Sequence, residues 1–69
     1  MTRVDITAIT TTVPTGDDDN MRRMQKLAAR DEDLRALGRS GYRMCSTVPI
    51  PSGDSMTIVD TLEREENQQ

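Results

Sequence analysis

The chain is poor in the large apolar side chains from which a protein core is built. Leu, Ile and Val together supply only twelve of the 69 residues, and Phe and Trp are absent. A domain of this size buries only about 60% of its unfolded surface, so its stability is marginal even with an ordinary apolar supply. A chain of this kind therefore needs a further source of stability.

The composition excludes two of the usual sources of stability in small domains, namely disulfides and structural metal sites. Cys45 is the only cysteine, so no disulfide can form within the chain. Histidine is absent, and a single thiol cannot assemble the ligand sets of structural zinc sites. We expect no metal and no cofactor. Association remains, and we expect a homo-oligomer, with a dimer favoured.

The first extended segment is predicted over residues 3–13. Val4, Ile6 and Ala8 alternate with polar residues, and the β-branched content favours a strand. Ile9 and Val13 fall on the other side of the pleat, so neither face is purely polar. Pro14 and Gly16 then turn the chain.

A helix is predicted from about Asn20 to Leu37. The acidic run Asp17–Asp19 precedes it, where negative charge and side-chain capping favour a helix N-terminus. Gly38 is the expected left-handed residue that closes the helix, and Gly41 allows a second turn. Six apolar residues recur at helical spacing and predict the buried stripe: Met21, Met24, Leu27, Ala28, Leu34 and Leu37.

Two further strands follow, over residues 42–48 and from Met56 onward, separated by a predicted loop over 49–55. In the first of these strands, Tyr42, Met44, Ser46 and Val48 are expected to share a face. The prediction is a small α+β domain of β-α-β-β order spanning residues 1–64, with residues 65–69 as a polar tail. One helix covers only one face of three strands, so the other face is wet or paired.

We expect the uncovered face to form the oligomer interface. The residues predicted for it are Ile9, Val13, Cys45 and Val59.

The segment "LRALGRSGYRMCSTVPIPSGDSMTIVDTLERE" resembles a family of short bacterial and phage proteins known only as a domain of unknown function. The shared core runs Leu-x-x-Leu-Gly-x-x-Gly-Trp-x-Leu and precedes a β-hairpin. Its positions are matched here by Leu34, Leu37, Gly38, Gly41, Tyr42 and Met44, with Tyr in place of Trp and Met in place of Leu. The resemblance covers residues 34–64 and implies a β-α-β-β fold without an assigned activity.

A basic stripe is the main candidate binding feature. Arg22, Lys26 and Arg30 recur every fourth residue, with Arg23 beside them. Such a stripe could bind phosphates of a nucleotide or nucleic acid, or an acidic partner. The commoner role of a charged helical face is solvation. The acidic net charge of −3 and the single aromatic residue disfavour a binder that stacks bases.

Two other features could carry chemistry, and each has a commoner structural role. Cys45 could be a nucleophile with Arg43 favouring its thiolate, but no histidine is present as a base, and free cysteine usually packs as a small apolar residue. Asp17–Asp19 could hold Mg²⁺ weakly, but helix capping is favoured. No nucleotide-binding loop or catalytic signature is present, so we expect no enzymatic activity.

The sequence thus favours a non-enzymatic, self-associating protein that acts by binding another protein, as a phage or host accessory factor. A binder of nucleotides or nucleic acid is the alternative, and an enzyme using Cys45 ranks last. The eight Arg against one Lys suggest a GC-rich genome such as that of an actinobacterium. No apolar run reaches membrane-spanning length and the N-terminus lacks the apolar core of a signal peptide, so we predict a cytoplasmic protein without a membrane partner.

Overall fold

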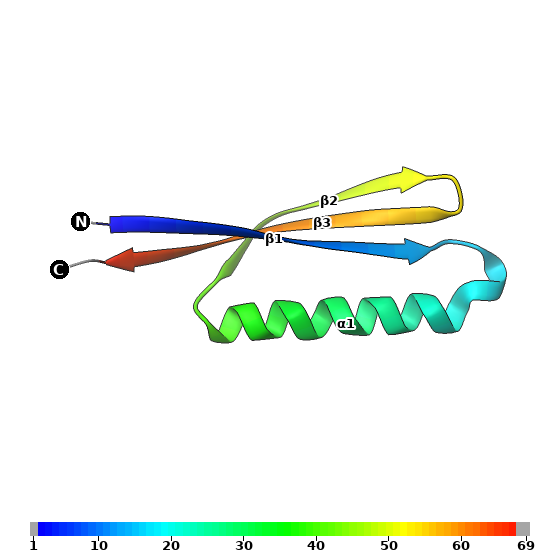
Figure 1. Cartoon of the computed structure of the whole chain (residues 1–69), viewed down its shortest axis with the longest axis horizontal. Coiled ribbons are helices and arrows are strands. Elements are labelled where there is room, and N and C mark those ends of the chain that lie inside the picture. The colour runs from blue at the N-terminus through cyan, green and yellow to red at the C-terminus, as the bar shows by residue number, and fades with distance from the viewer. Residues whose placement is uncertain (1, 68–69) are drawn as a thin grey trace.

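A computed structural model describes residues 2–67 of the chain. The elements are β1 (Thr2–Pro14), a short 3-10 turn η1 (Asp17–Asp19), α1 (Asn20–Arg39), β2 (Arg43–Ser52) and β3 (Ser55–Asn67). The three strands form an antiparallel sheet of order β1-β3-β2, and α1 lies against one face of it (Figure 1). The predicted α+β fold of β-α-β-β order is confirmed.

The two long strands pair without interruption. β1 and β3 keep one register from Thr2 opposite Asn67 to Pro14 opposite Ser55. β-branched residues are frequent in both, which suits a pleated, half-covered surface. Residues 65–67 therefore belong to the sheet, and the prediction of a polar tail from residue 65 is wrong for them. Residues 68–69 lie outside the described part of the chain.

β2 is an edge strand that contains two prolines. Pro49 and Pro51 lie within it, so the predicted loop over 49–55 shrinks to a tight turn at Gly53 and Asp54. Proline is tolerated here because an edge strand needs backbone donors on one side only. The register between β2 and β3 shifts between Met44 and Ser46, which makes Cys45 a bulge residue.

α1 ends at Arg39, and the left-handed residue that follows its C-cap Ser40 is Gly41 rather than Gly38. Gly38 lies inside the helix, while Gly41 adopts a φ of +93°. The amide of Tyr42 donates to the carbonyl of Leu37, and that of Gly41 donates to Gly38, both at 3.0 Å. This pair of bonds is the Schellman motif, in which the left-handed residue follows the helix. The prediction that Gly38 closes the helix is therefore wrong by three residues.

The face of α1 that meets the sheet also differs from the predicted stripe. Met21 and Met24 are about three-quarters exposed. The half-buried positions of the helix are Arg23, Arg30, Leu34 and Leu37, and with Leu27, which is 39% exposed, they follow a heptad-like spacing. Arg23 and Arg30 thus lie on the side of α1 that faces the sheet, where the sequence predicted apolar residues. Each arginine donates hydrogen bonds to acceptors on that side.

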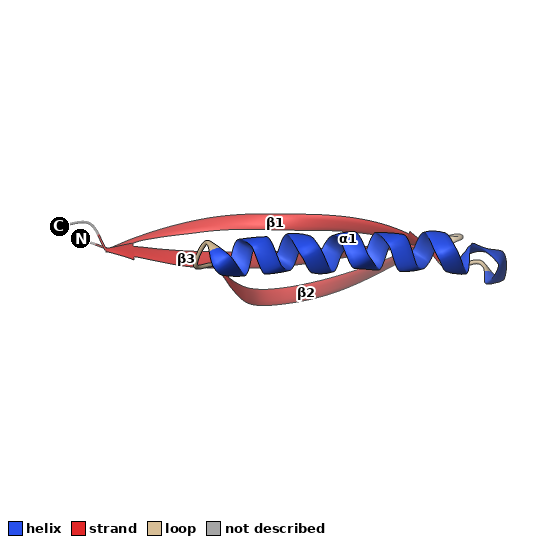
Figure 2. Ribbon diagram, turned by 90° about the horizontal axis from the view of Figure 1, so that it is seen from below, coloured by secondary structure: helices blue, strands red, loops and turns tan. Residues whose placement is uncertain are grey.

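The sheet has a covered face, turned toward α1, and an open face on the other side (Figure 2). Ile9 and Val13 point to the covered face, opposite Asp60 and Met56, and Val13 is buried. Val59 pairs with Thr10 and Val48 on the open face. The predicted interface set is therefore wrong for Ile9 and Val13, which α1 covers within the monomer.

Candidate interaction surface

The open face of the sheet is a broad, largely uncharged surface. Side chains alternate along each strand, so the register assigns every second residue to it. Its members are Val4, Ile6, Ala8, Thr10 and Thr12 of β1; Thr57, Val59, Thr61, Glu63 and Glu65 of β3; and Arg43, Ser46, Val48 and Ile50 of β2. Ile6 is 70% exposed, and Val48 and Ile50 are each about half exposed.

The charges of the open face gather at one end. Arg43 donates to the Glu63 carboxylate at 2.8 Å, close to the bulge at Cys45. Partial desolvation by its neighbours and the nearby Glu63 carboxylate raise the pKa of the Cys45 thiol above its usual value, although Arg43 opposes this. The thiol is accordingly held in its protonated form at neutral pH, which is the poor nucleophile. Cys45 is exposed and serves this end of the face as a small side chain.

The covered face has an ion pair at its centre. Asp60 is completely buried, and Arg30 donates to its two carboxylate oxygens at 2.7 and 2.9 Å. The hydroxyl of Thr47 donates to the same carboxylate at 2.8 Å. These hydrogen bonds hold the pKa of Asp60 below its ordinary value despite its burial. Sequence reasoning missed Asp60, although a carboxylate between the inward-facing Ile58 and Leu62 was a usable signal.

A second polar cluster fixes the end of the helix to the sheet. Arg64 of β3 donates to Asp5 of β1 at 3.0 Å and to the Ser40 carbonyl at 3.2 Å. Its guanidinium lies 4.8 Å from the centre of the Tyr42 ring, within the range of a cation–π contact. A Cβ atom at Gly41 would lie 3.3 Å from the Arg64 side chain. Gly41 thus provides both the left-handed turn and the room for Arg64.

The predicted basic stripe is divided by these contacts. Arg30 is bound to Asp60, and Arg23 donates to the carbonyls of Pro14 and Gly16 at 2.9 and 2.6 Å. Arg22 has only a 4.0 Å approach to Asp19, and Lys26 forms no ion pair within the described residues. The prediction of one continuous binding stripe is therefore wrong for Arg30 and Arg23.

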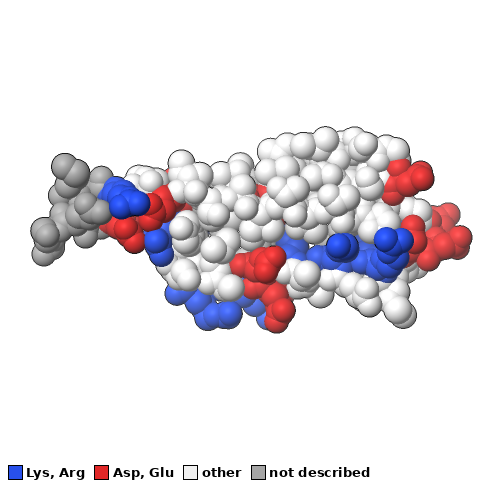
Figure 3. All heavy atoms as spheres, in the orientation of Figure 1, with Lys and Arg blue, Asp and Glu red and all other residues white. Residues whose placement is uncertain are grey.

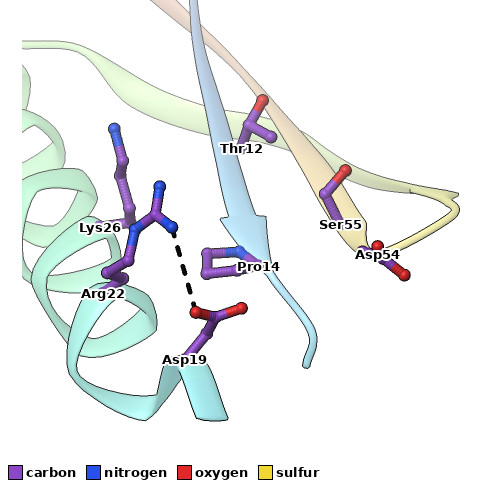
Figure 4. A pocket seen from close by; sticks show the side chains of 7 residues that line it. All are labelled: Thr12, Pro14, Asp19, Arg22, Lys26, Asp54 and Ser55. Atoms are coloured by element: carbon purple, nitrogen blue, oxygen red, sulfur yellow. Dashed lines mark ion pairs between the residues drawn. The ribbon is translucent and has the colours of Figure 1, made fainter. Parts of the chain in front are cut away.

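Arg22 and Lys26 border a shallow hollow of about 420 Å³ at the η1 end of the molecule (Figure 4). Its other walls come from the end of β1, from η1 and from the turn between β2 and β3. They are Thr12, Pro14, Asp19, Asp54 and Ser55. The hollow carries both signs of charge, with the two cations on α1 and a carboxylate on each flank.

The acidic run Asp17–Asp19 forms the 3-10 turn η1 and makes no side-chain capping bond to α1. The predicted side-chain cap is thus absent, although the carboxylates still lie where the helix dipole favours negative charge. Among residues 2–67 no group of three acidic, cysteine or histidine side chains is placed to hold a metal ion.

Comparison with known proteins adds no relative: no family model, no curated protein and no solved structure matches the chain. The resemblance noted over residues 34–64 stays a prediction. Among residues 2–67, no helix combines the length and the apolar character that crossing a membrane requires.

Proposed function

We propose that this chain is a non-enzymatic, self-associating protein whose open faces pack together in a two-fold dimer, and that the dimer acts by binding another protein. The observation that carries the proposal is the uncharged, half-exposed centre of the open face. Within one copy, Val13 and Leu62 are the only large apolar side chains that are buried among the described residues. In the dimer, the open faces of the two copies cover each other's apolar side chains and so enlarge the apolar core.

The exposed area supports the proposal. A compact monomer of this mass exposes about 4,300 Å², whereas this chain of 7.7 kDa exposes 5163 Å². The surplus of about 800 Å² matches what one partner contributes to a standard interface. The radius of gyration is 14.7 Å, against about 11 Å for a compact domain of this length.

The size of the open face is adequate for such contact. Three strands spaced about 4.8 Å apart, with ten residues or more of about 3.3 Å each, give a footprint of about 500 Å². Two copies packed face to face cover about 1,000 Å² in total, which is the lower bound for a specific interface. Aligned sheets of this kind pack about 10 Å apart with interdigitating side chains.

The charge distribution favours a second copy as the occupant. A two-fold axis passing near Val59 places the uncharged centres of the two faces against each other. We place this axis between the two sheets and across the strand direction, which puts the Glu63 and Glu65 ends of the two copies at opposite ends of the interface. Like charges therefore do not meet, and each charged end lies at the solvated rim.

The test is light scattering coupled to size-exclusion chromatography, with a dilution series reaching about 1 µM. We expect the unmodified chain to elute at twice the 7.7 kDa chain mass, and Val48→Glu to elute as a folded monomer. Val48 is half exposed on an edge strand, so the substitution buries no charge within one copy. A cooperatively folded monomer at every concentration would overturn the proposal.

The matched control is Met24→Glu. Met24 is 70% exposed on α1, away from the open face. This change adds the same charge and removes a comparable apolar side chain, and we expect it to preserve the dimer. Equal dissociation by Val48→Glu and Met24→Glu would show that the open face is not the interface.

A further inference from the structure

The two edges of the sheet are built differently. The outer edge of β2 carries Pro49 and Pro51, which lack backbone donors, and a bulge at Cys45. These are the devices by which natural sheets block unwanted pairing. β1 runs for thirteen residues with no proline before Pro14 and no register shift against β3. Within the described residues β1 pairs with β3 alone, so its outer edge offers unpaired backbone groups.

Positive charge lies beside the C-terminal end of this unprotected edge. Figure 3 shows a row of Lys and Arg atoms on the same side of the molecule as β1, running above α1 toward η1. Arg22 and Lys26 line a hollow together with Thr12 and Pro14 of β1 (Figure 4). Lys26 forms no ion pair within the described residues and Arg22 has only a 4.0 Å contact with Asp19, whereas Arg30 and Arg23 hydrogen-bond to groups within the chain.

We propose that the outer edge of β1 binds an extended acidic segment of a partner protein by strand addition. The backbone of the segment pairs with β1, which extends the sheet to four strands. Successive side chains of the segment alternate between the two faces. Those on the α1 side are carboxylates that reach Lys26 and Arg22, and those on the other side extend the open face with β-branched residues.

A peptide fits this edge better than a nucleic acid does. Backbone amides and carbonyls in a row are complementary to another strand. Nucleic acid binding draws on many cations and on stacking. Here two cations are available, the net charge is −3, and the single aromatic ring, Tyr42, is occupied by Arg64.

The inference rests on the proposed role as a protein-binding dimer, but it uses a different surface. Face-to-face packing leaves the strand edges free. The two proposals can therefore fail independently. The oligomeric mass tests the dimer formed by the open face, and peptide titration tests strand addition at the outer edge of β1.

The experiment uses a capped peptide of about ten alternating Glu and Val or Thr residues, added to the isotope-labelled full chain and followed by amide NMR. We expect shift changes along β1 and, in hydrogen exchange, added protection at every second β1 amide. Arg22→Glu combined with Lys26→Glu is expected to weaken binding about tenfold or more. The Val48→Glu monomer is expected to bind the peptide like the unmodified chain.

The control variant is Arg35→Glu. Arg35 is an exposed arginine of α1 that pairs with Asp31 rather than lining the hollow, and we expect its replacement to leave binding unchanged. Three results would overturn the proposal: equal binding of a peptide with Lys in place of Glu, shift changes confined to β2, or binding of a short oligothymidylate in preference to the peptide. Pairing of β1 with β1 of a second copy, seen as a tetramer on light scattering, would also overturn it.

Discussion

The two faces of the sheet reverse the usual arrangement of charge and apolar residues. At the centre of the covered face lies Asp60, fully buried with Arg30 and Thr47. At the centre of the open face lie Val59 and its neighbours Thr10 and Val48, which carry no charge. At the centres of the two faces, therefore, the ion pair is the covered feature and the β-branched side chains are the open one.

This difference indicates that the two faces of the sheet have separate roles, one in positioning α1 and one in association. A buried ion pair adds little net stability, because desolvation offsets the attraction, but it penalises every arrangement that leaves one partner alone. The Asp60–Arg30 pair therefore selects the position of α1 on the sheet. Apolar contact, which drives association, is left available on the open face.

The largest expected effect comes from breaking the covered face. Asp60→Asn keeps the shape of the side chain but leaves the Arg30 guanidinium without its counter-charge. Removing one partner of a buried pair costs about 3–5 kcal/mol, which is a large share of the stability of a small domain. We expect a large fall in the urea midpoint measured by circular dichroism.

The control for that variant is Asp31→Asn, which removes an exposed pair with Arg35. Exposed helical pairs contribute about 0.5 kcal/mol or less, so its midpoint is expected to change little. Similar midpoints for the two variants would contradict the role assigned to Asp60.

Acid is expected to produce the next effect. The pKa values of Asp60 and Asp5 are lowered in the folded chain by hydrogen bonds from Arg30 and Arg64. Groups with a lowered pKa stabilise the fold above their ordinary value, near 3.8, and lose that contribution as the pH falls through the folded value. We expect the urea midpoint to fall between about pH 5 and about pH 2.

The matched measurement is the same acid series on Asp60→Asn. Its midpoint is expected to fall less steeply, since one of the two linked carboxylates is gone. Parallel curves for the two proteins would show that Asp60 is not a source of the acid sensitivity.

The smallest effects concern the connection between α1 and β2, where Gly38 and Gly41 have different roles. Gly41→Ala places a side chain at a φ of +93° and against Arg64, and we expect a loss of about 1–2 kcal/mol. Gly38→Ala lies within the helix with nothing within 4 Å of its Cβ, and we expect a gain of about 0.5–1 kcal/mol. Thermal unfolding of both variants is the measurement, and a stabilising Gly41→Ala would contradict the assignment.

The order of the elements follows from local patterns in the sequence. Alternation over residues 3–13, helical spacing after Asn20 and the glycines before Tyr42 are local signals, and local signals suffice for strands, helices and turns. The shortage of apolar residues, with one cysteine and no histidine, likewise needed no structure.

Tertiary structure alone decided which face of each element is used. Alternation separates Ile6 from Ile9 but does not say which of them α1 covers. The bulge at Cys45 puts Met44 with Thr47 on the covered face, and Val48 on the open face, so the predicted shared face of Met44 and Val48 is wrong. Arg30 entered the interior because Asp60, thirty residues away in sequence, lay beneath it. Face selection depends on such long-range pairing, which no local pattern contains.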